Sequence, residues 1–303
     1  MVNRASLTNV PATVISVALV LVLGFLVTGC SAFGSSRQIT LEHMGWDENV
    51  AVSNLTKVLL EEELGYNVEL KLAEKLDSVF PDVADGEADA FQDVWMPNHE
   101  KNLEKVKDDV EHLDPWFEGE TSYGIAVPYY MQIDSLAELD RSGTDKIIGI
   151  EPRSTFHPQI TQSVIPAYDL DAQLVESSTP AMLTQLEKAY KYEEPIAFLA
   201  WSPHWMNDKY KFRYLEDPKD AQGKFNDPAK ISTIVRRGLA EDDPTAYAFL
   251  KTLSLSKEEV IQMEADINEK GSGDPIKGVK AWLARNQEVV QPWIDAAKEA
   301  EEA

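Results

Sequence analysis

The chain has a single cysteine, Cys30, and few basic residues for its length of 303. A lone thiol cannot form an intramolecular disulfide, so the fold has to rest on its hydrophobic core. The 28 Lys and Arg residues stand against 52 Asp and Glu residues, which gives a formal net charge of −24 at pH 7. So acidic a surface repels a phosphate backbone, which argues against nucleic acid as a partner. The histidines His43, His112 and His157 are not spaced as ligands of one metal ion, and neither a metal nor another cofactor is expected.

The longest apolar run lies at the N-terminus, from about Thr13 to Thr28, and follows one early basic residue, Arg4. This run is short for a membrane-spanning helix, which needs about 20 apolar residues. It ends in small residues just before Cys30. The pattern therefore predicts an export signal over residues 1–29.

The residues around the cysteine, "VTGC", resemble a bacterial lipoprotein box. The resemblance implies a lipid on the thiol of Cys30 and a place on the extracytoplasmic face of the cell membrane. The small and polar stretch that follows predicts a tether over residues 30–37 between this anchor and a folded body.

The body combines short apolar runs with amphipathic stretches, a pattern that predicts parallel strands joined by helices in an α/β fold. With 44% hydrophobic residues, the chain can form two domains or one large one. The first expected strand, "QITLEHMGW", is followed by a helix with Asp47 as N-cap and Gly65 as its stop.

Three of the seven tryptophans occupy the same kind of position in the sequence. Trp46, Trp95 and Trp201 each come at the carboxyl end of an expected strand, the edge at which open α/β sheets bind ligands. Several ring faces around one space suit a quaternary ammonium group, which has no N–H to donate and is held by the ring quadrupoles. The other tryptophans are expected to have structural roles: Trp116, Trp205, Trp282 and Trp293.

Several stretches of the chain resemble the substrate-binding subunits of ABC importers for glycine betaine and related osmoprotectants. They are "GWDENVAVSNLTKVLLEEELGYNVEL", "DAFQDVWMPNHE", "RYLEDPK" and the region from "VIPAYDLDAQ" to "IAFLAWSPHWM". The resemblance covers nearly the whole chain after the export signal. It implies a receptor rather than an enzyme, expected to be a monomer, with an ABC permease and its ATPase as partners.

The same resemblance implies a two-lobed periplasmic-binding-protein fold, type II-like, with the ligand in a cleft between the lobes. The expected boundaries give one lobe residues 38–127 with 232–303 and the other residues 128–231.

The resemblance also assigns the ligand-binding residues. It implies that Trp46, Trp95 and Trp201 surround the trimethylammonium group and that His99 binds the carboxylate of the betaine. Relatives have a glycine-containing turn in the second lobe, where this sequence reads "RSTFHP". Ser154, Thr155 and Phe156 are expected to line the pocket there, with Arg153 as an additional positive partner.

Alternative functions remain open at this stage. The same scaffold serves receptors for choline, carnitine, proline betaine or ectoine, and choline differs because it lacks a carboxylate. A secreted glycosidase also combines tryptophans with paired acids. The acids near the tryptophans are Asp47, Glu48, Asp93 and Glu100. A purely structural surface lipoprotein is the third possibility, and it predicts that no small ligand stabilises the fold.

Overall fold

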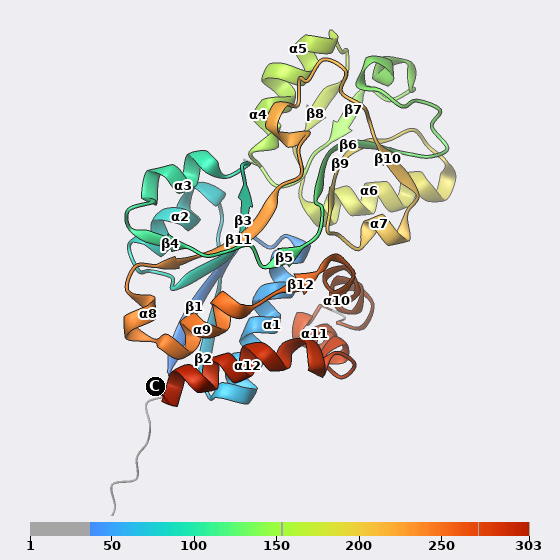
Figure 1. The fold of residues 1–303 in the computed structure, drawn as a ribbon. Coiled ribbons are helices and arrows are strands. Elements are labelled where there is room, and N and C mark those ends of the chain that lie inside the picture. Colours follow the sequence, from blue (N-terminus) through green and yellow to red (C-terminus); the bar gives the residue numbers. More distant parts are fainter. Residues whose placement is uncertain (1–36, 153, 272, 303) are drawn as a thin grey trace, which may run out of the picture. The chain divides into compact units, whose positions relative to one another are not determined.

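The computed structural model describes residues 37–152, 154–271 and 273–302, which form one compact unit from Arg37 onward. The predicted export signal, the tether before Arg37 and Cys30 lie outside the described residues, and so does Arg153. Two five-stranded sheets organise this unit, and each is the centre of one lobe (Figure 1).

The sheet of the first lobe has the strand order β2-β1-β3-β11-β4. Strand β1 pairs in parallel with β2 and β3, whereas β11 runs antiparallel to both β3 and β4. The strands are β1 (Gln38–His43), β2 (Asn67–Leu72), β3 (Ala90–Met96), β4 (Val110–His112) and β11 (Lys230–Arg236). A two-stranded sheet joins β5 (Phe117–Glu118) to β12 (Leu255–Ser256).

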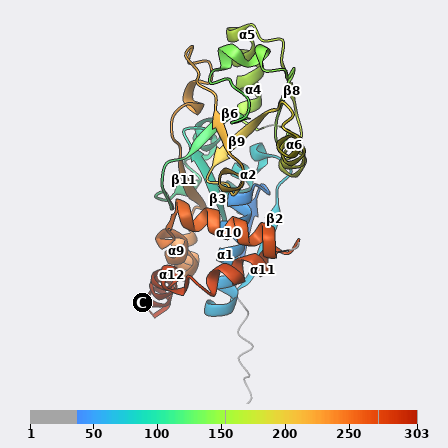
Figure 2. The same ribbon diagram turned by 90° about the vertical axis from the view of Figure 1, so that its right-hand side faces the viewer.

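Helices cover both faces of the first sheet. Helix α1 packs against β1, β2 and β3 and is contacted in turn by α10, α11 and α12, which Figure 2 shows grouped around it. The helices are α1 (Asp47–Leu64), α2 (Leu76–Ala84), α3 (Glu100–Val106), α8 (Leu239–Asp242), α9 (Pro244–Thr252), α10 (Lys257–Lys270), α11 (Pro275–Leu283) and α12 (Gln287–Glu302).

Helix α1 ends where the sequence predicts and begins one residue away from the predicted cap. Gly65 follows its last turn with φ of 72°, a left-handed conformation that glycine adopts without a steric penalty. The N-cap is Trp46 rather than Asp47, because the Asp47 side chain turns away from the helix to His204 and Trp205.

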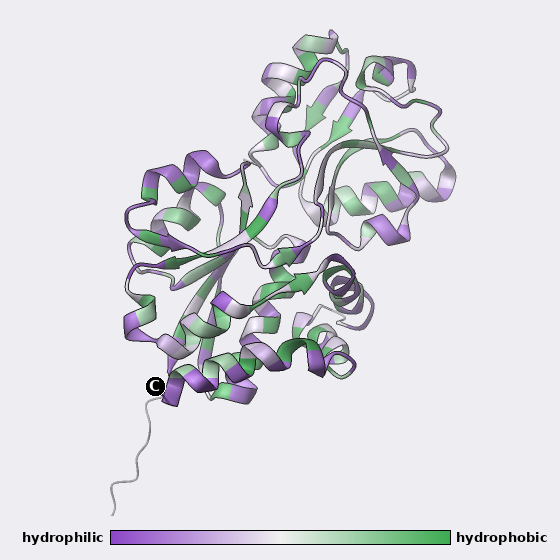
Figure 3. Ribbon diagram, in the orientation of Figure 1, coloured by the Kyte–Doolittle hydropathy of each residue, from purple (hydrophilic) through white to green (hydrophobic). Residues whose placement is uncertain are grey.

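The sheet of the second lobe has the strand order β10-β6-β9-β7-β8. Strand β7 is parallel to β8 and β9, and β6 is antiparallel to β9 and β10. Figure 3 shows hydrophobic residues concentrated on β7 and β8, whereas the helices carry hydrophilic stretches. The strands are β6 (Ser122–Pro128), β7 (Lys146–Ile148), β8 (Gln173–Val175), β9 (Ala197–Ser202) and β10 (Phe212–Tyr214).

The helices of the second lobe are mostly short. The longest is α6 (Thr179–Tyr192), whose N-cap Ser178 accepts the N–H of Ala181. The others are the α-helices α4 (Phe156–Gln159), α5 (Ile165–Tyr168) and α7 (Met206–Lys209), the 3₁₀ helices η1 (Leu136–Arg141) and η3 (Gly223–Phe225), and the π-helical turn η2 (Ile160–Val164).

The chain crosses between the two sheets in two places, and strand pairing puts both crossings a few residues from the expected boundaries. Strand β6 pairs with β9 from Ser122 onward, and β11 pairs with β3 from Lys230 onward. The crossings are therefore residues 119–121 and 226–229. The expected boundary lies between residues 127 and 128, but Ser122 to Ala126 already pair with β9 of the second sheet.

Candidate functional site

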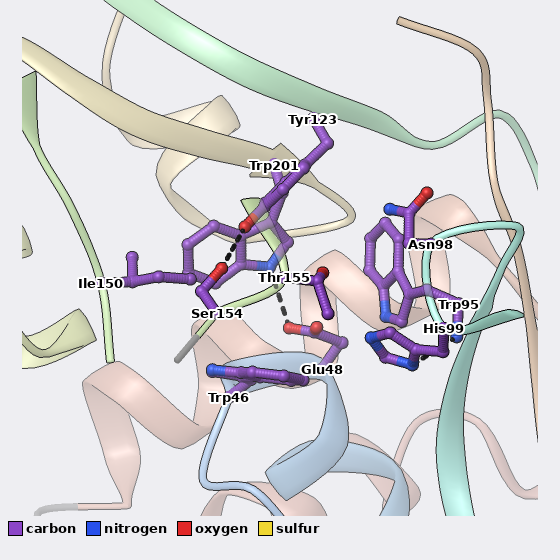
Figure 4. A pocket seen from close by; sticks show the side chains of 10 residues that line it. All are labelled: Trp46, Glu48, Trp95, Asn98, His99, Tyr123, Ile150, Ser154, Thr155 and Trp201. Atoms are coloured by element: carbon purple, nitrogen blue, oxygen red, sulfur yellow. Dashed lines mark hydrogen bonds between the residues drawn. The ribbon is translucent and has the colours of Figure 1, made fainter. Parts of the chain in front are cut away.

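A pocket between the two lobes brings the three selected tryptophans together. It leaves about 370 Å³ of space that no protein atom fills, part of which is open to solvent. Figure 4 shows the indoles of Trp46, Trp95 and Trp201 around this space. We call these three residues the tryptophan box. The pocket is lined by Trp46, Glu48, Trp95, Asn98, His99, Tyr123, Ile150, Ser154, Thr155 and Trp201.

Strand geometry explains how the rings reach one space. Trp95 is the last but one residue of β3, and Trp46 follows the neighbouring parallel strand β1 as N-cap of α1. Trp201 is the last but one residue of β9 in the other sheet. Two sheets thus present the ends of their strands to the same cleft, as open α/β sheets do when they bind ligands.

Tyr123, which is not among the residues expected from the sequence, lines the pocket from β6. Tyr123 lies directly opposite Trp201 in the antiparallel pairing of β6 with β9, so the two side chains point to the same face. The ring centroids of Tyr123 and Trp95 lie 6.3 Å apart. The hydroxyl oxygen of Tyr123 is 3.1 Å from that of Ser154. Burial raises the pKa of Tyr123, which keeps the phenol neutral.

Phe156 does not line the pocket. It is fully buried behind Tyr123, with ring centroids 5.0 Å apart, and it also packs on Phe225 at 4.6 Å. Its neighbours Ser154 and Thr155 do line the pocket. Phe156 therefore supports the wall of the pocket from the core of the second lobe.

His99 reaches the pocket as a neutral ring in a defined tautomer. Its Nδ1 accepts the main-chain N–H of Trp95 at 3.1 Å, which leaves Nε2 to carry the proton. Burial, helped by the nearby charge of Lys224, lowers the pKa of His99 to about 3. The imidazole can therefore donate one hydrogen bond without carrying a charge.

The site also contains a buried carboxylate, Glu48, on the first turn of α1. It accepts the indole N–H of Trp201 at 2.9 Å. Burial raises the pKa of Glu48 well above its ordinary value, and the charges of Asp93 and Glu264 raise it further. A cation in the pocket would favour the ionised form of this carboxyl group.

The polar side of the pocket continues into a second cavity, which shares Asn98, Ser154 and Thr155 with it. Lys224 lines this second cavity, and its Nζ donates to the carbonyls of Pro97 at 2.9 Å and Asn98 at 3.1 Å. The site therefore has an aromatic end at the tryptophan box and a polar end near Lys224.

The residues expected to be structural lie outside this pocket. Trp116 and Trp282 are fully buried, and Trp293 packs edge-on against Phe249. His204 is buried beside Asp47, with Nε2 3.2 Å from the carboxylate, and Trp205 donates its indole N–H to the same side chain.

The chain is similar in sequence to known substrate-binding proteins of transport systems. Residues 37–285 match the model of a family described as the substrate binding domain of ABC-type glycine betaine transport systems. The glycine betaine/carnitine transport binding protein GbuC of Listeria monocytogenes is 37% identical over 144 residues. That match spans only 46% of this chain and 46% of the Listeria protein.

Two solved structures cover most of the chain. The lactococcal protein OpuAC, in a closed conformation with glycine betaine, is 31% identical and matches 86% of this chain and 100% of its own with a TM-score of 0.76. An ABC-transporter choline binding protein in complex with choline is 25% identical and matches 87% of this chain and 97% of its own with a TM-score of 0.75. The expected two-lobed α/β fold is confirmed by these matches.

Proposed function

The chain belongs to the family of substrate-binding domains of ABC-type glycine betaine transport systems, and on this premise we propose that it is an extracytoplasmic receptor for glycine betaine or a related quaternary ammonium compound. It delivers this ligand to the permease and ATPase of an ABC importer. The observation that carries the proposal is the convergence of Trp46, Trp95 and Trp201 on one pocket between the lobes.

The tryptophan box suits the trimethylammonium group. Such a group cannot donate a hydrogen bond, so aromatic faces and exclusion of water have to hold it, at roughly 0.5–2 kcal/mol for each ring. Tyr123 adds a fourth aromatic side chain to the lining.

The polar end suits the carboxylate of a betaine. His99 offers Nε2–H, and Asn98, Ser154 and Thr155 add polar side chains to the lining. Lys224 lies beyond them in the adjoining cavity and supplies a positive charge on the same side. The expected role of Arg153 falls on a residue outside the described part of the chain.

Choline is the second candidate ligand, and Glu48 is the observation that favours it. A purely cationic ligand in the tryptophan box would favour the ionised form of this buried side chain, whose pKa is otherwise raised by burial, and would then have it as its counterion. Glycine betaine carries its own carboxylate and depends on the polar end as well.

The arrangement of acids supports binding without catalysis. Glycosidases need two carboxyl groups on either side of the bond that they cleave. Of the four acids near the tryptophans, Glu48 lines the pocket, Asp47 and Asp93 accept indole N–H groups, and Glu100 is exposed.

The test is a thermal-shift panel on the chain from Ser35 onward, which contains the compact unit Arg37–Ala303. Glycine betaine, choline, carnitine, proline betaine and ectoine are compared at equal concentrations. A ligand that binds only the folded state raises the free energy of unfolding, by about 2.7 kcal/mol at a concentration of 100 times its Kd. The midpoint of thermal unfolding rises with it. If none of these compounds raises the midpoint, the proposed function is wrong.

Attachment to the membrane through a lipid on Cys30 is a further part of the proposal. Among residues 37–152, 154–271 and 273–302, no helix is both long and apolar enough to span a bilayer. In cells, mass spectrometry of the full chain should find a diacylated Cys30 at the mature N-terminus. An unmodified Cys30, or a mature N-terminus elsewhere, contradicts the anchor.

A further inference from the structure

Four indole N–H groups at the cleft each donate to an oxygen of an acidic side chain. The pairs are Trp46 with Glu151 at 3.2 Å, Trp95 with Asp93 at 2.7 Å, Trp201 with Glu48 at 2.9 Å and Trp205 with Asp47 at 2.8 Å. Tryptophans away from the cleft differ. Trp116 donates to the main-chain carbonyl of Gln92, and the indole N–H of Trp282 has no acceptor among the described residues.

Two of these pairs connect the tryptophan box across the cleft in opposite directions. Trp46, in the first lobe, donates to Glu151, which follows β7 in the second lobe. Trp201, in the second lobe, donates to Glu48 on α1 of the first lobe. Each lobe therefore contributes one ring of the box together with the acceptor for a ring of the other lobe.

Glu151 is itself held firmly in the second lobe. Its Oε1 accepts the main-chain N–H of Thr179 at 2.7 Å, and its Oε2 accepts the hydroxyl of the same residue at 2.8 Å. Thr179 is the first residue of α6, where main-chain N–H groups lack partners within the helix and the helix dipole favours a negative charge. The carboxylate that receives the Trp46 indole is thus fixed before the lobes meet.

Glu151 does not line the ligand pocket, although its neighbour Ile150 does. Its effect on a ligand therefore has to pass through the ring of Trp46. The hydrogen bond from the indole Nε1 to Glu151 has a preferred direction, so it restricts the orientation of the Trp46 ring.

We propose that Glu151 is a positioning residue of the quaternary ammonium site, which fixes the Trp46 ring from the opposite lobe and completes the tryptophan box only when the lobes are closed. The proposal rests on the proposed function for its ligand. The reciprocal bond from Trp201 to Glu48 also fixes a ring of the box from the opposite lobe. Glu48 additionally lines the pocket, so it affects a bound cation directly.

The test compares Glu151→Ala and Glu151→Gln with the parent protein. The probe is tetramethylammonium chloride, which has no carboxylate and therefore reports on the aromatic end alone. Calorimetry should give an affinity about tenfold weaker for Glu151→Ala. Glu151→Gln should recover part of it, because its one amide oxygen can still accept the indole N–H while its NH₂ group faces the main-chain N–H of Thr179. Trp205→Phe is the matched control, since it removes an indole–carboxylate pair across the cleft outside the pocket, and it should stay within about twofold of the parent.

Small-angle scattering without ligand keeps this inference separate from the proposed function. Glu151→Ala should have a larger radius of gyration than the parent, because one bond between the lobes is lost. If the parent binds no quaternary ammonium compound, the proposed function is wrong. In that case, equal radii of gyration for Glu151→Ala and the parent overturn the role of Glu151 as well. If the parent binds tetramethylammonium, the inference is overturned when folded Glu151→Ala binds it equally well, or when Glu151→Gln is as weak as Glu151→Ala. Where Glu151→Ala does not fold, an affinity of Glu151→Gln about tenfold or more below that of the parent overturns it.

Discussion

Asp93 accepts the indole N–H of Trp95, two residues further along the same face of β3, at 2.7 Å. Its second oxygen, Oδ2, is buried and has no hydrogen-bond partner among the described residues. Burial raises the pKa of Asp93 to about 7 from an ordinary value of 3.8. The protein therefore carries near its ligand pocket a carboxyl group that holds its proton more tightly when folded than when unfolded.

This shift predicts how stability depends on pH. Above about pH 4 the unfolded chain releases the Asp93 proton while the folded protein keeps it, so the free energy of unfolding falls as pH rises and levels off above the folded pKa of about 7. The full effect is on the order of a few kcal/mol. In Asp93→Asn the loss of stability between pH 5 and pH 8, measured by urea denaturation, should be clearly smaller than in the parent. Equal losses in the two proteins would contradict the prediction.

The tryptophan box predicts a common effect of three substitutions. Trp46→Ala, Trp95→Ala and Trp201→Ala should each weaken glycine betaine binding about tenfold or more, because each loses about 1–2 kcal/mol of cation–π energy and buried area. Trp→Phe at the same positions should retain more affinity.

The control for the box is Trp282→Ala, a fully buried position on α11 outside the pocket. It should lower the melting temperature and leave the affinity of the folded fraction unchanged. Calorimetry that finds parental affinity in all three box variants would assign these tryptophans to the core alone.

His99 predicts a difference between ligands. His99→Ala removes the Nε2–H donor, so glycine betaine should bind about tenfold more weakly, as expected for roughly 1.5 kcal/mol from a hydrogen bond to a charged group. Choline has no carboxylate and should be affected much less. Because the pKa of His99 is about 3, the donor should not change with pH between 5 and 8. Equal losses for the two ligands would remove His99 from the carboxylate end.

Close packing between α10 and α11 predicts a change in stability without a change in binding. A Cβ atom at Gly278 would lie 2.3 Å from the Cα and 2.5 Å from the N of Ile267, and both are main-chain atoms. Gly278→Ala should therefore cost about 1–3 kcal/mol in thermal unfolding, with unchanged affinity of the folded protein. Gly65→Ala is the comparison, because its Cβ meets nothing within 4 Å and only its positive φ is unfavourable. A larger cost at Gly65 than at Gly278 would speak against the packing argument.

The sequence predicted the parts of the site that depend on strand ends. Trp46, Trp95 and Trp201 could be grouped because each ends an apolar run, and such runs end at the same edge of a sheet. Tyr123 could not be selected in this way, because its position depends on which residue β6 places opposite Trp201. A pairing register between strands so far apart along the chain leaves no local signal.

The acids show the same limit. Glu48 reads in the sequence as one of two acids in the first turn of a helix, which is a common feature of exposed helices. Its burial depends on the second lobe, whose Trp201 covers it. Phe156 is expected in the pocket because "RSTFHP" stands where relatives have a glycine-containing turn, but a side chain that begins a short helix can point into the core instead.

The insertion of β11 between β3 and β4 has a consequence for the order in which the first sheet can form. A chain that emerges from its N-terminus releases β1 to β4 first, then the whole sheet of the second lobe, and only afterwards β11. Until that strand arrives, β3 has an unpaired edge and β4 has no neighbour, and such edges invite aggregation. The strand β4 has only three residues, and its last two, Glu111 and His112, are exposed and polar. The strand that has no neighbour in the sheet until β11 arrives therefore offers little surface for a wrong one.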